Sequence, residues 1–272
     1  MTKKKRTWIF TLLALLIAAL HISPFYIMIN MSLKTLSDRS SRWMPALHPH
    51  FENYVTAMEH GNLMSAMWNT FQITALSVII IVVAGAMVAY PLARKASRKN
   101  QIILTFIVGV MMVPQLSILV PLYKEMVTLK GINKLWGIVI VSATFHLPMA
   151  IYMYSNFIRS IPKELDEAAM IDGCSRMQAF FQVILPCLKS TTVSVIILNG
   201  VGIWNDYQFQ LYFLQKPAMR TITLAISTFF TDSKQDLGAA AAAAFIVVLP
   251  PVLIYIFLQK YFVKGAMDSA VK

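Results

Sequence analysis

Apolar runs recur along this chain, and several reach the roughly 20 residues that a helix needs to cross a bilayer. Of the 272 residues, 57% are hydrophobic and only 13% are charged, and the mean hydropathy is +0.63. A soluble domain carries about 25% charged residues. The sequence therefore predicts an all-α polytopic membrane protein.

Six membrane-spanning helices are expected from these runs. They cover about residues 8–31, 71–93, 102–123, 135–157, 191–214 and 238–262. Prolines in several runs predict kinks or local breaks, which membrane helices tolerate where neighbours satisfy the freed carbonyls. These prolines are Pro114, Pro121, Pro148, Pro250 and Pro251. We expect residues 1–272 to form one transmembrane domain, in which kinked helices surround a pathway.

The basic residues predict the orientation. Lys3 to Arg6 precede an apolar run that continues to Ile29, too long for a signal peptide, so we expect a retained first helix. With the N-terminus in the cytosol, 15 of the 24 Lys and Arg residues lie in cytosolic segments. The net charge of +12 therefore fits membrane loops rather than binding to nucleic acid. Both termini and the loop after the fourth span are predicted to be cytosolic.

Residues 32–67 form the longest outer loop. Its aromatic and proline residues predict a folded cap at the outer membrane surface. They are Trp43, Pro45, Pro49, Phe51 and Tyr54.

The polar interruption at residues 159–190 carries its own helix signals. Ser160 is predicted to cap a helix that has Pro162 in its first turn. Acidic residues follow at the positive end of that helix: Glu164, Asp166 and Glu167.

A second short helix should follow the first within this interruption. Gly173 supplies the left-handed turn that ends the first helix, and Ser175 to Gln178 reads as a capping box that opens the second. Leu185–Pro186 then returns the chain to the bilayer. Leu165, Ala168 and Ala169 share one face of the first helix, where the two alanines leave a shallow surface. The sequence thus predicts a rigid helix–turn–helix elbow that docks a partner.

The motif Glu167–Ala168–Ala169, then Gly173 and Leu185–Pro186 at this spacing, resembles the signature of ATP-binding-cassette importer permeases. The resemblance covers nearly the whole chain and is strongest to the MalG-like half of carbohydrate importers. Supporting matches are Ser32-Leu33-Lys34, Glu52-Asn53-Tyr54, Trp68-Asn69-Thr70, Trp204-Asn205-Asp206 and Lys264-Gly265. Val183 stands where Ile is usual, which conserves the branched side chain. Ser190 stands where a second Pro is common, so the exit into the fifth span should be less sharply bent.

The resemblance implies six helices in the type I importer arrangement, with the elbow docked on a cytosolic ATPase. It also implies a MalF-like second permease, two ATPase subunits, an external sugar-binding protein and a bacterial or archaeal inner membrane. By carry-over, the residues that contact the ATPase would be Glu167, Ala168, Ala169, Asp172 and Gly173. The chain has no Gly-x-x-x-x-Gly-Lys-Ser/Thr phosphate loop, so ATP and Mg²⁺ would be bound by the ATPase subunits and no cofactor by this chain. It is therefore expected not to be an enzyme.

The fifth span carries a polar string at Trp204, Asn205, Asp206 and Gln208. Ionisable groups inside a membrane usually face a cavity or a partner. Amides, a carboxylate and an aromatic face also suit the hydroxyls and CH groups of a sugar. These residues are candidates for the substrate path, and the alternative is adhesion to the partner permease.

Gln115 and His146 are secondary candidates for the path, because each lies near a proline that breaks a helix. The alternative for His146 is a packing role. The histidines show no spacing typical of metal ligands.

Three other functions stay open at this point. A permease for glycerol phosphate or a peptide would want Lys or Arg inside a span, and no span interior holds one. A secondary transporter would want repeat symmetry and paired intramembrane carboxylates, yet only Asp206 is available. An intramembrane enzyme would need a nucleophile with a base, or a metal motif, and none is present. The residues therefore favour a sugar importer.

Overall fold

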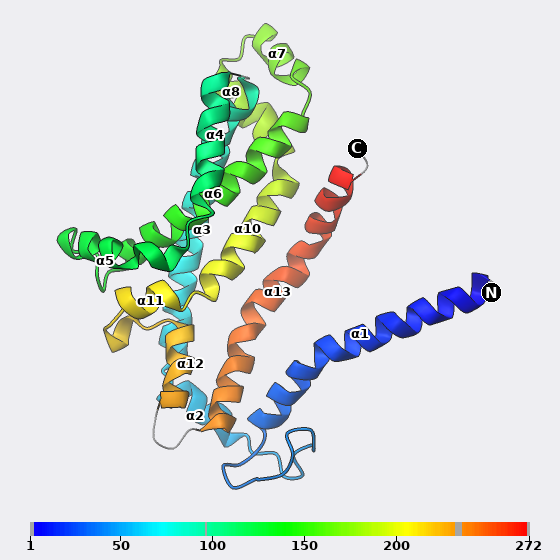
Figure 1. The fold of residues 1–272 in the computed structure, drawn as a ribbon, viewed down its shortest axis with the longest axis vertical. Helices are drawn as coiled ribbons and strands as arrows, with labels where there is room; N and C mark the ends of the chain where they lie inside the picture. Colours follow the sequence, from blue (N-terminus) through cyan, green and yellow to red (C-terminus); the bar gives the residue numbers. More distant parts are fainter. Residues whose placement is uncertain (1–2, 96, 232–235, 271–272) are drawn as a thin grey trace. The chain divides into compact units, whose positions relative to one another are not determined.

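The computed structural model describes residues 3–95, 97–231 and 236–270, and these segments contain helices and no strand, as predicted. The helices are labelled in Figure 1. Their bounds are α1 Lys3–Ser32, α2 Glu52–His60, α3 Leu63–Arg94, α4 Arg98–Val110, η1 Gln115–Ile118, α5 Leu119–Thr128, α6 Leu135–Ser160, α7 Glu164–Ile171, α8 Arg176–Ala179, η2 Phe180–Ile184, α9 Leu185–Cys187, α10 Lys189–Trp204, α11 Gln208–Phe213, η3 Pro217–Met219, α12 Ile222–Thr231 and α13 Leu237–Ala270.

Four of the described helices are long and apolar enough to cross a membrane. They are Trp8–Ser32, Leu63–Arg94, Leu135–Ser160 and Leu237–Gln259. Two bent pairs, Arg98–Val110 with Gln115–Thr128 and Arg176–Cys187 with Lys189–Trp204, bring the number to six if each is one span. The six apolar runs therefore all appear as helical segments.

The third run is not one helix. α4 ends at Val110, and η1 with α5 continues at 91° to it. Pro114 lies at this break, where its ring disfavours a helical conformation for the residue before it. In contrast, Pro148 remains inside α6, and Pro250 and Pro251 remain inside α13. Of these four prolines, only Pro114 lies at a break between helices.

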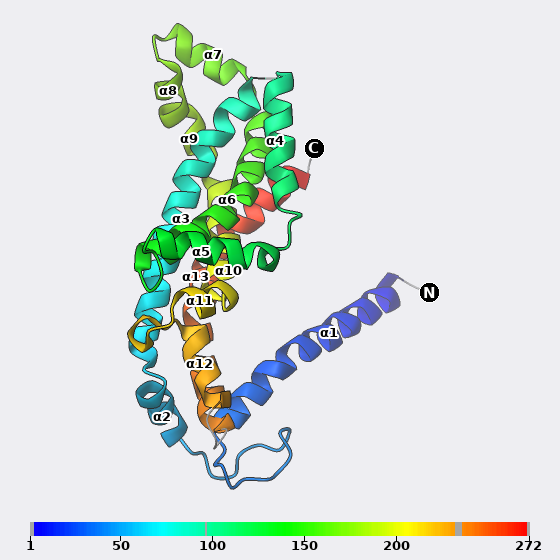
Figure 2. The ribbon, with the colours of Figure 1, turned by 60° about the vertical axis from the view of Figure 1, so that its left-hand side comes forward.

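The chain forms two compact units, and the first contains residues 1–66 and 224–250. In this unit the loop after α1 is folded, as predicted (Figure 2). The buried Asn30 amide donates to the carbonyls of Arg42 and Met44 and accepts from the Ala46 N–H at 2.9 Å. The Tyr26 and Trp43 rings stack at 6.4 Å. The loop is therefore held by hydrogen bonds to a buried amide and by a pair of stacked rings.

The start of α13 closely approaches the same loop. Asn53 of α2 is 6% exposed, and its amide donates to the carbonyls of Ser32 (2.9 Å) and Lys34 (2.8 Å). A Cβ at Gly238 would lie 2.6 Å from the Asn53 amide nitrogen and 2.9 Å from the Lys34 carbonyl oxygen. Glycine at 238 is therefore required by this contact.

The second unit contains residues 67–223 and 251–272, and α6 lies at its centre. α6 packs against α4, α10 and α11. α3 approaches it closely, because a Cβ at Gly85 would lie only 3.2 Å from the Ala150 Cβ, and the Ser77 hydroxyl donates to the Val139 carbonyl. The Tyr154 hydroxyl donates to Thr192 of α10 at 3.0 Å. Small residues and a few hydrogen bonds therefore hold α6 to its neighbours.

We predict that Gly238→Ala lowers the free energy of unfolding by about 1–3 kcal/mol, because the added methyl group has to displace the Lys34 backbone or the Asn53 amide. Thermal unfolding in detergent, followed by fluorescence, measures the change. Gly109→Ala is the matched control, since nothing lies within 4 Å of a Cβ there. Equal midpoints for the two variants would contradict the predicted contact.

Candidate functional site

Residues 159–190 fold into the predicted helix–turn–helix elbow, made of α7, α8, η2 and α9. Gly173 has a φ of +90°, and the N–H of the next residue, Cys174, donates to the Ala169 carbonyl at 3.0 Å. The Ser175 hydroxyl accepts from the Gln178 N–H, and the Gln178 side chain accepts from the Ser175 N–H at 2.8 Å. The glycine turn and the capping box are therefore both confirmed.

The start of the elbow differs from the prediction. α6 continues through Ser160, whose hydroxyl donates back to the Phe157 carbonyl at 2.8 Å. α7 begins only at Glu164, and Lys163 stands before it without a side-chain capping bond. The prediction that Ser160 caps this helix was wrong, because the fourth span extends three residues further than its apolar run.

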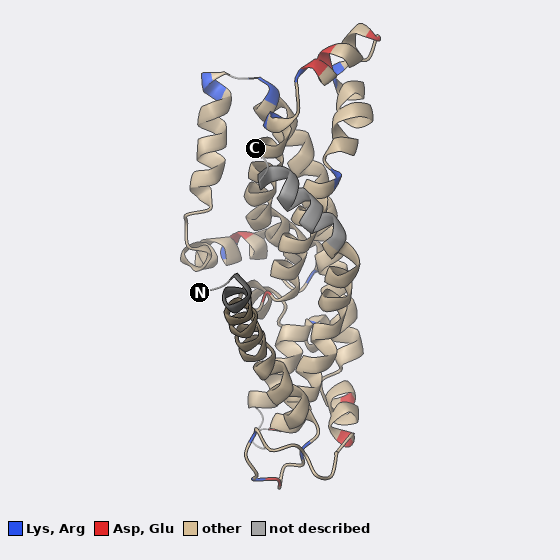
Figure 3. Cartoon of the chain, turned by 90° about the vertical axis from the view of Figure 1, so that its right-hand side faces the viewer, with Lys and Arg blue, Asp and Glu red and all other residues tan. Residues whose placement is uncertain are grey.

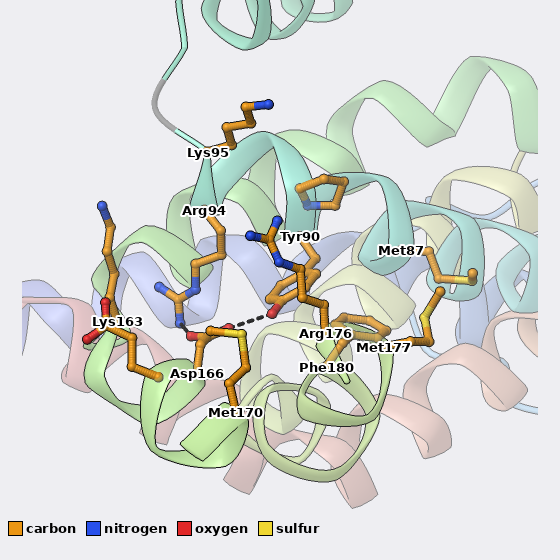
Figure 4. Close-up of a pocket in the computed structure, with 12 residues that line it drawn as sticks. Met87, Tyr90, Arg94, Lys95, Lys163, Asp166, Met170, Arg176, Met177 and Phe180 are labelled. Carbon is orange, nitrogen blue, oxygen red and sulfur yellow. Dashed lines mark hydrogen bonds and ion pairs between the residues drawn. The ribbon is translucent and has the colours of Figure 1, made fainter. Parts of the chain in front are cut away.

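Arg94, the last residue of α3, joins three elements at the base of the elbow. Its guanidinium lies 2.6 Å from the Asp166 carboxylate of α7 and donates to the carbonyls of Ile158 (2.9 Å) and Ile161 (2.8 Å) at the end of α6. The Tyr90 hydroxyl donates to the other Asp166 oxygen at 2.6 Å (Figure 4). We name Arg94, Asp166 and Tyr90 the anchor.

Both charges of the anchor are taken out of water. The Arg94 side chain is 13% exposed and that of Asp166 is 9% exposed. A buried ion pair of this kind is strongly destabilised when one partner is removed. The last carbonyls of a helix also lack partners within the helix, and Arg94 supplies donors to them at the end of α6. The anchor therefore fixes the position of α7 relative to α3 and α6.

An aromatic contact supports the anchor. The Phe180 side chain is 2% exposed, and its ring centroid lies 5.0 Å from that of Tyr90. The elbow and the end of α3 enclose a cleft of about 670 Å³ with methionines at 87, 170 and 177 and basic residues along its wall (Figure 4). Figure 3 shows the acidic residues of α7 at the same end of the second unit as the basic residues where α3 ends and α4 begins.

The outer face of α7 is small, apolar and acidic. Glu167, Ala168, Asp172 and Gly173 are exposed, as expected for a docking surface. Ile171 is 86% exposed and was missed by the sequence analysis, although it follows Ala168 by three residues. Ala169 is only 7% exposed, because it lies one turn after Asp166 on the inner face. The alanines therefore divide between the two faces instead of sharing one.

The polar string of the fifth span lies where its helix ends. α10 stops at Trp204, and Asp206 accepts from the Phe209 N–H at 3.4 Å at the start of α11. Trp204 is buried, Asp206 is half-buried, and Asn205 and Gln208 are exposed. The predicted continuous span to residue 214 was therefore wrong, because Asp206 turns the chain into a second short helix.

Asp206 belongs to a polar cluster. Gln210 is fully buried and accepts from the hydroxyls of Thr221 and Thr223, and Thr223 also donates to the Asp206 carbonyl at 2.8 Å. Within the described part of the chain, the Trp204 Nε1 and one Asp206 carboxylate oxygen are buried without a hydrogen-bond partner. Two buried polar atoms two residues apart thus lack partners at the end of α10.

The two secondary candidates, His146 and Gln115, have different surroundings. His146 of α6 lies 3.2 Å from the amide oxygen of Asn199 in α10, and a Cβ at Gly202 would lie 2.7 Å from the His146 ring. These contacts are what a packing residue between α6 and α10 would make. Gln115 starts η1 and is exposed.

Known proteins match most of the chain. Residues 81–267 match the family model described as "Binding-protein-dependent transport system inner membrane component". The chain is 39% identical over 272 residues to the melibiose/raffinose/stachyose import permease protein MelC of Bacillus subtilis, covering 100% of this chain and 98% of that protein. It is 32% identical over 266 residues to AmyC of Thermoanaerobacterium thermosulfurigenes, a probable permease for starch degradation products, covering 97% of each.

A solved structure shares the fold. A chain of a bacterial ABC transporter involved in the import of the acidic polysaccharide alginate superimposes with a TM-score of 0.80 at 18% sequence identity. The superposition covers 96% of this chain and 99% of that one. The arrangement of helices is therefore that of an ABC importer permease.

We predict that Arg94→Gln or Asp166→Asn alone lowers the free energy of unfolding by about 3–5 kcal/mol, since each leaves one buried charge unpaired. The double variant should lose less than the sum of the two, because it buries no unpaired charge. Thermal unfolding of the four proteins measures this coupling. Glu164→Gln is the control, an exposed carboxylate on the same turn. A double variant whose loss equals the sum would contradict a direct interaction.

Proposed function

Because the chain belongs to the family of binding-protein-dependent transport system inner membrane components, we propose that its elbow couples sugar import to cytosolic ATPase subunits. The chain is a permease subunit and not an enzyme. The observation that carries the proposal is the anchor, which fixes α7 to the ends of α3 and α6. A partner that displaces α7 would therefore move the ends of α3 and α6 together.

The outer face of α7 supplies the chemistry for docking. Ile171 is the apolar centre that a partner has to cover, and Glu167 lies one turn before it as a hydrogen-bonded or ion-paired rim. Ala168 lets the partner backbone come close. A cleft on the ATPase with an apolar floor and a basic edge would fit this surface.

The solute is proposed to be an uncharged sugar or oligosaccharide. MelC and AmyC are named for sugar and starch-product transport, and this chain matches each over nearly its full length. Lys and Arg occur only at the ends of the four long span helices, so these spans offer no cation to an anionic solute. The unsatisfied Trp204 and Asp206 atoms are suited to sugar hydroxyls.

The remaining partners follow from the same proposal. A second permease completes the path, and two ATPase subunits engage the two elbows. A sugar-binding protein docks on the folded cap at residues 32–67. This arrangement requires α7 and both chain termini on the cytosolic side, in agreement with the distribution of Lys and Arg in the sequence.

We predict that Glu167→Ala or Ile171→Ser lowers ATP-dependent sugar uptake by about tenfold or more, because each removes part of the docking surface. The complex that co-purifies with this chain is reconstituted in proteoliposomes, and uptake is measured with a panel of labelled sugars. Glu125→Ala is the control, an exposed glutamate of α5 that lies outside the elbow.

Retention of the ATPase on the purified complex should fall with uptake in the two variants. Wild-type uptake in both would contradict the docking role of this face. Uptake that follows an ion gradient, with no ATPase in the complex, would contradict the proposed function altogether.

We predict that Asp206→Asn raises the KM of uptake roughly tenfold while sparing assembly, since the Asn oxygen still accepts from the Phe209 N–H but the charge is lost. Uptake and co-purification are measured together. Thr223→Val is the control, because it removes hydrogen bonds from the same cluster without changing the carboxylate. An unchanged KM in Asp206→Asn, or an equal change in the control, would contradict a role in the substrate path.

A further inference from the structure

The loop after α1 folds back against the C-terminal end of that helix (Figure 2). The Tyr26 hydroxyl donates to the Trp43 carbonyl at 2.9 Å, and the two rings stack at 6.4 Å. One turn further along α1, the buried Asn30 amide binds the backbone of residues 42–46. These residues are therefore held alongside the last two turns of α1. Together with Leu47, which follows them, we name them the strap.

The depth of the strap follows from the part of α1 that it contacts. The apolar stretch of α1 starts at Trp8, directly after the basic N-terminal residues, and a hydrocarbon core of about 30 Å takes roughly 20 helical residues. Counted from Trp8, a core of roughly 20 residues ends next to Tyr26. A tilt of α1 would lengthen this count and place Tyr26 deeper. The strap therefore lies at the level where the hydrocarbon meets the headgroups.

A second span of the same unit gives the same level. α13 is apolar from its first residue, and a Cβ at Gly238 would lie 2.9 Å from the Lys34 carbonyl oxygen at the start of the cap. Further along α13, the Phe245 ring meets the Tyr54 ring of α2 edge-on, with the ring centroids 6.2 Å apart. The cap is therefore packed beside the ends of both spans.

The strap exposes apolar side chains at this level. Trp43 is 60% exposed, Met44 is 58% exposed and Leu47 is 86% exposed. Tyr26, on which Trp43 stacks, is also exposed. Trp and Tyr combine an apolar ring with a polar edge, and they gather at the interface between a membrane and water for this reason.

We propose that the strap is inserted in the headgroup region of the bilayer, with Trp43, Met44 and Leu47 in contact with lipid. The depth of the strap identifies lipid as the occupant, because apolar side chains that project beside a span at this level meet the bilayer. The inserted strap would fix the height of the cap. Residues 35–41 would then remain in water for the proposed binding protein.

The test measures the depth of the strap in the complex that co-purifies with this chain, reconstituted in nanodiscs. Cys174→Ser/Cys187→Ser removes both native cysteines, and a nitroxide is attached at Met44→Cys or Leu47→Cys. The hydrogen bonds of the strap to Asn30 are kept, since backbone groups make them. Collision rates of each nitroxide are measured with oxygen, which concentrates in lipid, and with a nickel chelate, which stays in water.

A label at Ser37→Cys is the matched control, because it lies on the exposed stretch of the cap beside the Asp38 carboxylate. The ratio of oxygen to nickel collisions at positions 44 and 47 should exceed the ratio at position 37 severalfold. Ratios equal to the control would place the strap in water and overturn the proposal. Low collision rates with both reagents would show that another subunit covers the strap, and would overturn it as well.

Trp43 is tested as the residue that holds the strap at this depth. Trp43→Gln, combined with the label at position 47, should lower the ratio toward that of the control. Trp43→Tyr should keep most of it, because it retains a ring with a polar edge. An unchanged ratio in Trp43→Gln would overturn the insertion of the ring pair.

The labels in the native strap decide the proposal even if Trp43→Gln fails to assemble. Because no transport is measured, the result does not depend on the proposed coupling function.

Discussion

The Arg94 guanidinium is the group on which the elbow depends. A helix that ends inside a protein leaves carbonyls without donors, and a carboxylate buried beside it needs a cation. Arg94 meets both needs, because it donates to Ile158 and Ile161 of α6 and pairs with Asp166 of α7. Its fork of donors allows these bonds at once, which a lysine could not reproduce. The end of one span and the start of the elbow are therefore fixed by a single side chain.

This interaction also ties both halves of the elbow to α3. Asp166 is held by Arg94 and Tyr90, and Tyr90 packs against Phe180 on the far side of the Gly173 turn. Both short helices of the elbow thus contact α3 near its last residues. Charges of this kind add little net stability compared with apolar packing, but they specify one arrangement against others. In the proposed coupling role, a single arrangement lets a displacement of α7 reach α3 and α6.

The sequence predicts the parts of the fold that depend on local chemistry. The Gly173 turn, the Ser175–Gln178 capping box and the apolar runs were found because each is encoded within a few neighbouring residues. The interruption at Pro114 was predicted correctly, but the break at Asp206 was missed, since polar residues in a span do not say whether a helix continues or ends. Arg94 was assigned only to the charge balance of the loops, because its partner Asp166 is brought close by the packing of α3, α6 and α7.

Local sequence also does not show which face of α7 is exposed. Small residues at 168 and 169 fit either face of a short helix, so periodicity alone cannot choose between them. Burial of Asp166 makes the choice, and it takes Ala169 inward with it while turning Ala168 and Ile171 outward. The proposed docking surface is consequently defined by an ion pair on the opposite side of the helix. A partner that binds α7 would contact Ile171 and Glu167. Arg94 fixes the positions of both side chains without itself lying in the contact.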